Sequence, residues 1–176
     1  WKPAAENKYW LGGFIWTGFD YRGEPTPFKW PNINSHFGVM DMCGFPKNLY
    51  YYYQSWWTDK DVLHISPHWN WPVKWGEPAP VKEVWVNSNA DSVELFLNSK
   101  SLGTQIMPRN GHLQWKVTYA PGTLEAVAYK KGRRFTAKVE TTGAPAEVVL
   151  TPYKTTMLAD GKDVTVMNVS IIDRQG

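Results

Sequence analysis

Residues 62–140 contain about seven short runs that are rich in β-branched and aromatic residues, many with alternating apolar and polar side chains. Alternation with period two is typical of a strand with one buried face, because successive side chains point to opposite sides. In one run, Val93, Leu95 and Leu97 can share a single face. The expected strands are 62–65, 81–87, 92–98, 101–105, 112–118, 123–129 and 133–140.

Turn-forming residues separate these runs at short intervals. Asn, Asp, Gly and Pro gather in such gaps because they adopt the backbone conformations that tight turns need. Several short strands at this spacing indicate an immunoglobulin-like β-sandwich over residues 61–142, in a chain that is mainly β. Cys43 is the single cysteine, so the disulfide of antibody domains is excluded. The turns are expected at 89–91, 98–100, 110–111, 121–122 and 131–132.

A linker, TGAP at 142–145, follows the sandwich, and the strand pattern restarts over 147–151 and 164–172. Roughly 30 residues are too few to bury a sandwich core on their own. We therefore expect residues 143–176 to be the first strands of a further, truncated β domain. The chain begins at Trp1 rather than Met, so we expect it to be a piece of a longer protein.

Residues 1–60 hold most of the aromatic residues. The run LGGFIW at 11–16 is continuously apolar, which is typical of a fully buried strand in a parallel sheet. A long loop rich in Gly and Pro follows over 17–45, and loops of this length in compact domains are commonly functional. Pro46 suits the first position of a helix that we expect over 47–57. Strand, loop and helix together form one βα unit.

The chain has 11 Trp, 9 Tyr and 7 Phe among its 176 residues. Flat aromatic faces attract the slightly positive C–H groups of sugars, so this excess hints at carbohydrate binding. The 19 Lys and Arg against 16 Asp and Glu leave a small positive charge, with no basic cluster larger than that at 130–134. That cluster suits a hairpin turn, so no nucleic-acid partner is expected. No apolar run is long enough to span a bilayer, so no membrane partner is expected.

The chain carries no recognisable metal or phosphate motif. His64 and His68 are four residues apart, but Pro67 between them excludes the helical geometry that would align them. Hydrolysis of a glycosidic bond needs two carboxylates, and none of the eight Glu follows a buried strand. Asp20 and Asp41 lie in the loop after the first strand, where a (β/α)8 barrel carries its working residues. They could bind hydroxyl groups, but they do not form an acid and nucleophile pair.

Three stretches carry a resemblance to a known family. The segments GGFIWTGFDY at 12–21 and SHFGVMDMCGFPK at 35–47, with the aromatic helix after them, resemble the end of the catalytic domain in glycoside hydrolase family 2. Within that family, the bacterial β-galactosidases are the most similar. The run DSVELFLNSKSLG at 91–103 resembles the immunoglobulin-like domain that follows the barrel in many of these enzymes.

The resemblance implies a retaining hydrolase whose two catalytic Glu lie on barrel strands before residue 11, so no catalytic residue is expected here. Residues 1–60 would be the C-terminal end of the (β/α)8 catalytic domain, and the chain alone is expected to be inactive. Trp16 matches the Trp that lines the sugar subsite, and Asp41 matches a polar position that contacts the far side of the ring. Asp20 also matches a family position, where a structural hydrogen-bonding role and a binding role both stay open.

The same resemblance bears on the substrate. β-Glucuronidase members place Asn and Lys two residues apart to hold the uronate carboxylate, at a position where this chain has Asp41 and Cys43. An Asp would repel a carboxylate, so we expect a neutral β-glycoside such as a β-galactoside. No cofactor or metal ligand is predicted in this chain, and the departure leaves open whether the full-length enzyme holds the usual sugar-adjacent cation.

Two other functions stay open. A surface with His68-Trp69-Asn70-Trp71 and Trp75 would suit a non-catalytic carbohydrate-binding β-sandwich module, whereas an adhesive or structural immunoglobulin-like protein would have no sugar affinity. The expected partner is an oligosaccharide or glycoside. A barrel strand without neighbours has free edges, so we expect residues 1–60 to be disordered, packed on the sandwich or shared between chains of a homo-oligomer. A periplasmic or extracellular parent enzyme is favoured over a cytoplasmic one.

Overall fold

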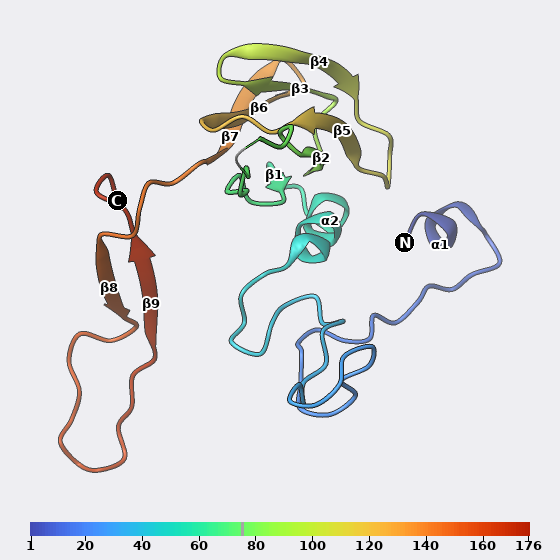
Figure 1. Ribbon diagram of the computed structural model, residues 1–176. Helices are drawn as coiled ribbons and strands as arrows, with labels where there is room; N and C mark the ends of the chain where they lie inside the picture. Colours follow the sequence, from blue (N-terminus) through green and yellow to red (C-terminus); the bar gives the residue numbers. More distant parts are fainter. Residues whose placement is uncertain (75) are drawn as a thin grey trace. The chain divides into compact units, whose positions relative to one another are not determined.

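The computed structural model describes residues 1–74 and 76–176, and the chain is mainly β (Figure 1). It divides into two compact units, Trp1–Glu140 and Thr141–Gly176. Trp75, which the sequence suggested as part of an aromatic surface, lies outside the described residues. No helix among the described residues is long and apolar enough to cross a bilayer.

Seven strands of the first unit form two antiparallel sheets, and each lies at one of the runs expected from the sequence. The three-stranded sheet has the order β1-β2-β5 and the four-stranded sheet has the order β4-β3-β6-β7. The strands are β1 (Leu63–Ser66), β2 (Val81–Ser88), β3 (Ser92–Leu97), β4 (Lys100–Ile106), β5 (Leu113–Thr118), β6 (Thr123–Lys130) and β7 (Arg133–Glu140).

The two sheets share one hydrophobic core, as in a β-sandwich. Val84 and Val86 come from one sheet, whereas Val93, Leu95 and Leu124 come from the other, and all five side chains are fully buried. The alternation predicted for the strands is clearest in β5, which contributes every second residue to the space between the sheets.

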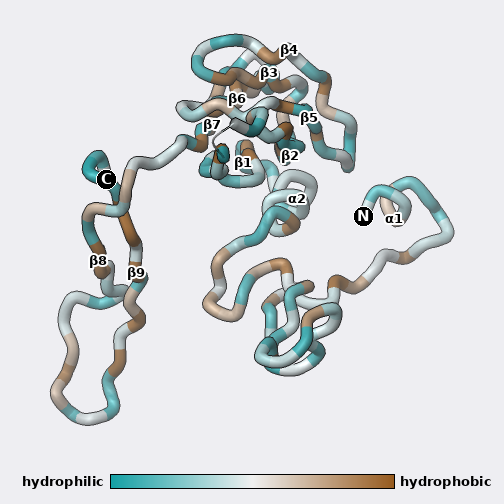
Figure 2. The backbone as a smooth tube through the Cα atoms, in the orientation of Figure 1, coloured by the Kyte–Doolittle hydropathy of each residue, from teal (hydrophilic) through white to brown (hydrophobic). Residues whose placement is uncertain are grey.

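The second unit is a hairpin of β8 (Glu147–Pro152) and β9 (Met167–Ile172). Val148 pairs with Ile171 and Leu150 pairs with Val169, so these side chains share one face, where each is 57–70% exposed. Figure 2 shows apolar residues on both strands of this hairpin. A two-stranded sheet with an uncovered apolar face is at best marginally stable alone. That residues 143–176 begin a further β domain stays a prediction.

The strand expected over 11–16 does not form, and that prediction is wrong for this chain. The segment has no regular structure, and the side chains of Leu11 and Phe14 are fully exposed. An apolar run becomes a buried strand only where neighbouring strands accept its backbone hydrogen bonds. None of the described strands pairs with it, so the run stays extended and exposed. A short helix that the sequence did not suggest, α1 (Lys2–Glu6), precedes it.

The expected aromatic helix is α2 (Asn48–Trp57), whose N-cap is Lys47, so the helix starts after Pro46 rather than at it. It packs on the three-stranded sheet of the first unit. The Tyr51 ring stacks on His64 with ring centroids 3.6 Å apart, and burial lowers the pKa of His64 to about 4. Further along the helix, the Trp56 indole N–H donates to the carbonyl of Gly111 at 3.0 Å.

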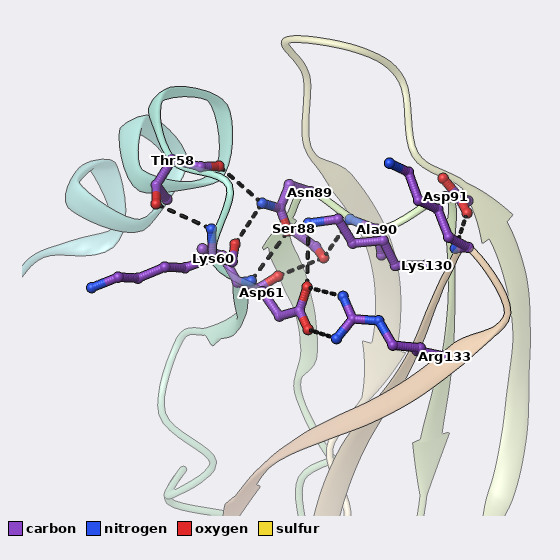
Figure 3. A network of polar contacts seen from close by, with 11 residues as sticks. Thr58, Lys60, Asp61, Ser88, Asn89, Ala90, Asp91, Lys130 and Arg133 are labelled. Carbon is purple, nitrogen blue, oxygen red and sulfur yellow. Dashed lines mark hydrogen bonds and ion pairs between the residues drawn. The ribbon is translucent and has the colours of Figure 1, made fainter.

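A network of polar contacts fixes the segment between α2 and β1 to the sandwich (Figure 3). The Asn89 amide donates to the carbonyl of Lys60 at 2.7 Å, and the Ser88 hydroxyl donates to the carbonyl of Val62 at 2.7 Å. Asp61 forms an ion pair with Arg133, Oδ2 to Nη1, at 3.0 Å. The exit of the helix is therefore held by both sheets.

The shared core predicts a large effect of Leu95→Ala. Leu95 is fully buried, so truncation leaves a cavity and should lower the free energy of unfolding by about 2–5 kcal/mol. Urea unfolding followed by circular dichroism measures this. The matched control is Ile106→Ala, at a side chain that is 83% exposed, where we expect a change below about 0.5 kcal/mol. Equal losses in both variants would contradict a core between the two sheets.

Candidate functional site

The loop after residue 16 is folded on itself by a short parallel pairing of two backbone segments, 17–20 and 38–40. The N–H groups of Val39 and Met40 donate to the carbonyls of Thr17 and Gly18, both at 2.9 Å. The Asp20 N–H donates back to Met40 at 2.9 Å. This pairing needs a glycine at position 38, because a Cβ there would lie 2.3 Å from the backbone nitrogen of Asp20.

Asp20 is the last residue of the first paired segment and is buried. Its Oδ1 accepts the Gly38 N–H at 2.7 Å, and its Oδ2 accepts a hydrogen bond from Lys47 Nζ at 2.5 Å. Burial by itself would raise the pKa of Asp20, but the hydrogen bonds from Lys47 and Gly38 and the Lys47 charge hold it below its ordinary value. Both carboxylate oxygens are therefore engaged within the protein.

Trp16 lies just before the first hydrogen bond of the pairing, and its side chain is 75% exposed. It lines a hollow of about 420 Å³ together with Glu24, Thr26 and Phe37, which we call the Trp16 hollow. Two exposed aromatic rings, Trp16 and Phe37, provide apolar surface in this hollow. Such an arrangement suits a ligand with one apolar face.

A polar chain joins the aromatic part of the Trp16 hollow to a carboxylate. The Trp16 indole N–H donates to Tyr21 Oη at 3.2 Å, and the Tyr21 hydroxyl donates to Glu24 Oε2. The Tyr21 ring also meets the Trp16 and Phe37 rings edge to face. Tyr21 therefore fixes the orientation of the two aromatic residues and of Glu24 at once.

Asp41 lies beyond the other end of the pairing and does not line the Trp16 hollow. Its Oδ1 accepts the N–H groups of Cys43 and Phe45 at 2.8 and 2.9 Å, which closes a tight turn. Its Oδ2 makes no hydrogen bond among residues 1–74 and 76–176. The structure therefore does not bring Trp16 and Asp41 to one hollow, although the sequence suggested both for sugar contact.

Sequence reasoning missed Tyr21, Glu24 and Phe37 as site residues. A signal was present, since Glu24 stands between Gly23 and Pro25 in the long loop that the composition marked as functional. Glu24 has a φ of +47°, a left-handed backbone conformation that is uncommon for residues other than glycine. Glu24 follows no strand, so the expectation that functional carboxylates lie at strand ends did not include it.

The aromatic surface considered for a carbohydrate-binding module has one buried ring, Trp69, whereas His68 and Asn70 are exposed and Trp71 is half-buried. Trp69 is fully buried, and its indole N–H donates to the carbonyl of Ala120 at 3.0 Å. Trp71 stacks on His68 and carries the ammonium of Lys82 at 3.6 Å from its ring centroid. Trp69 is therefore not available as a sugar platform. Among the described residues, no three His, Cys, Asp or Glu are grouped so that they could hold a metal ion.

Relatives of known sequence cover the whole chain. A family model described as a domain of unknown function, DUF4982, matches residues 80–136. The chain is 45% identical to "Beta-galactosidase BoGH2A" of Bacteroides ovatus, over 99% of this chain and 20% of that protein. It is 31% identical to "Beta-glucuronidase" of Formosa agariphila, over 100% of this chain and 18% of that protein. The chain thus spans about a fifth of the length of these curated relatives.

Solved structures give the same result. A β-glycosidase from Bacteroides vulgatus matches with a TM-score of 0.87 and 36% identity, over 100% of this chain and 22% of that one. A glycosyl hydrolase family 2 member from Bacteroides cellulosilyticus matches with a TM-score of 0.87 and 31% identity. The match covers 100% of this chain and 27% of that one. The resemblance drawn from the sequence is confirmed: the chain matches a segment of these proteins and belongs to glycoside hydrolase family 2.

Proposed function

We propose that the chain is the C-terminal portion of a retaining glycoside hydrolase that acts on β-galactosides or a similar neutral β-glycoside. In this proposal, residues 1–60 complete a (β/α)8 catalytic barrel, 61–142 form an immunoglobulin-like accessory domain, and 143–176 begin a further β domain. The catalytic Glu pair lies outside the chain, which supplies one wall of the sugar subsite. The identity to a β-galactosidase over 99% of the chain supports this assignment.

The observation that carries the proposal is the Trp16 hollow. A pyranose has an apolar C–H face and a rim of hydroxyl groups, and the hollow offers aromatic rings beside hydrogen-bonding oxygens. A single carboxylate lines it among the described residues, whereas a retaining mechanism needs two about 5–5.5 Å apart. The hollow thus suits substrate binding and leaves the bond-breaking step to residues from elsewhere in the parent enzyme.

Within this proposal, Asp20 and Asp41 have different roles. Asp20 is a positioning residue, since both of its oxygens are engaged and it fixes the loop that carries Trp16. Asp41 holds the turn at 41–45 through Oδ1, which leaves Oδ2 for a hydroxyl group of the substrate. The chain needs no cofactor of its own for these roles.

A Trp16→Ala variant of the full-length enzyme tests the proposal. Loss of the stacking surface should lower kcat/KM for p-nitrophenyl β-D-galactopyranoside by at least about tenfold, the equivalent of roughly 1.4 kcal/mol. Trp30→Ala is the matched control, because Trp30 is 83% exposed in the same loop and does not line the hollow. If both variants keep the activity of the unmodified enzyme, Trp16 is not part of the subsite.

The assignment of Asp20 as a positioning residue predicts local loosening in Asp20→Asn. The pKa of Asp20 is lowered in the folded protein, so its ion pair contributes stability above the ordinary value of 3.8 and loses it as the pH falls through the lowered pKa. At pH 6, we expect amide hydrogen exchange at Val39 and Met40 to accelerate about tenfold in the variant.

Hydrogen exchange with mass spectrometry on peptides that cover residues 36–47 measures this loosening. The control is Asp59→Asn, which removes an exposed carboxylate outside the loop. Unchanged exchange in Asp20→Asn would show that the Lys47 ion pair does not hold the loop.

A further inference from the structure

We infer that Glu24 determines which sugar the Trp16 hollow accepts, favouring a neutral pyranose and rejecting one that carries a carboxylate. This inference rests on the proposed function and names the residue that sets its substrate class. Relatives named as a β-galactosidase and as a β-glucuronidase both match the chain, so the charge of the preferred sugar is a property that differs among similar proteins.

Glu24 is the one charged residue among the described residues that line the Trp16 hollow, the others being Trp16, Thr26 and Phe37. No Lys or Arg of the described chain lines it, so the hollow presents a carboxylate and no cation to a ligand. A uronate bound beside Glu24 would bring two like charges together, and no cation among the described residues that line the hollow would offset them. Glu24 is exposed, so solvent screens part of this repulsion, but a neutral sugar does not incur it at all.

The Glu24 carboxylate is also oriented for hydroxyl recognition. Its Oε2 accepts the Tyr21 hydroxyl, which in turn accepts the Trp16 indole N–H. Its Oε1 makes no hydrogen bond among residues 1–74 and 76–176, so this oxygen can accept a sugar hydroxyl. A hydrogen bond from a hydroxyl to an ionised acceptor is stronger than a neutral one, which rewards the substrate that carries the hydroxyl group.

The left-handed backbone conformation of Glu24 supports a role of this residue in ligand binding. Its φ of +47° is a conformation that a glycine would adopt with less strain, yet a Glu occupies the position between Gly23 and Pro25. Residues in such conformations concentrate at ligand-binding sites, where the direction of the side chain matters. The strain here aims a carboxylate at the hollow that Trp16 lines.

Asp41 is less suited to the same task. One of its oxygens already holds a tight turn, and the residue lies beyond the far end of the backbone pairing from Trp16. The sequence suggested that Asp41 disfavours a uronate. In the structure, Glu24 is the acidic residue that lines the hollow, so we assign this effect to Glu24.

The test compares two substrates in the full-length enzyme, p-nitrophenyl β-D-galactopyranoside and p-nitrophenyl β-D-glucuronide, before and after Glu24→Gln. The amide keeps the size of the side chain and an oxygen for the Tyr21 hydroxyl, but it removes the charge and places an NH2 donor where Oε1 was the free acceptor. We expect the ratio of kcat/KM for the glucuronide to kcat/KM for the galactoside to rise about tenfold. Glu83→Gln, at an exposed position on β2, is the charge-matched control and should leave the ratio unchanged.

The outcomes separate this inference from the function on which it rests. An unmodified enzyme that hydrolyses neither of these two substrates nor any other neutral p-nitrophenyl β-glycoside overturns the proposed function, and the inference with it. An unmodified enzyme that prefers the glucuronide overturns both the neutral substrate of the proposed function and the inference. An unchanged ratio in Glu24→Gln, in an enzyme that prefers the galactoside, overturns the inference alone. If kcat/KM of Glu24→Gln falls equally for both substrates and its Tm is unchanged, Glu24 acts only by positioning Tyr21, and the inference is wrong.

Discussion

Three consecutive polar residues at the end of β2 hold the helix and its exit to the sandwich. The Asn87 amide donates to Asn48 Oδ1 at 2.6 Å, and Ser88 and Asn89 bond the carbonyls of Val62 and Lys60. Asn87 and Ser88 are buried, so each would leave a costly unsatisfied group if its partner moved. The position of α2 is therefore determined by the sandwich rather than by the loop that precedes it.

This constraint reaches the candidate site through a short series of contacts. Asn48 is the first residue of α2 and follows Lys47, whose ammonium binds both Asp20 and the carbonyl of His36. Asp20 then holds the Gly38 N–H, and the adjacent backbone pairing ends beside Trp16. These contacts link the sandwich to the backbone pairing beside Trp16, although residues 11–16 have no strand neighbours among the described strands.

The sequence predicted those parts of the fold that depend on local pattern. Strands such as 113–118 bury every second residue, and this alternation is visible in the sequence because one face of each strand meets the core. The strand over 11–16 was predicted wrongly, because a continuous apolar run becomes a strand only beside other strands. For the site, the resemblance assigned Trp16 to a sugar subsite, which stays a prediction, but Glu24 was not identified from the sequence. Trp16 and Glu24 are linked by two hydrogen bonds through the Tyr21 hydroxyl. Such a contact leaves no repeating pattern of apolar and polar residues in the sequence, so it could not be predicted from periodicity.

The central claim is that the Trp16 hollow forms one wall of a neutral sugar site. A crystal structure of the full-length enzyme with an uncharged, galactose-configured inhibitor tests it most directly. The account predicts the C–H face of the sugar ring within about 4 Å of the Trp16 indole, with a hydroxyl group hydrogen-bonded to Glu24. An inhibitor bound in the enzyme without contact to either residue would contradict it.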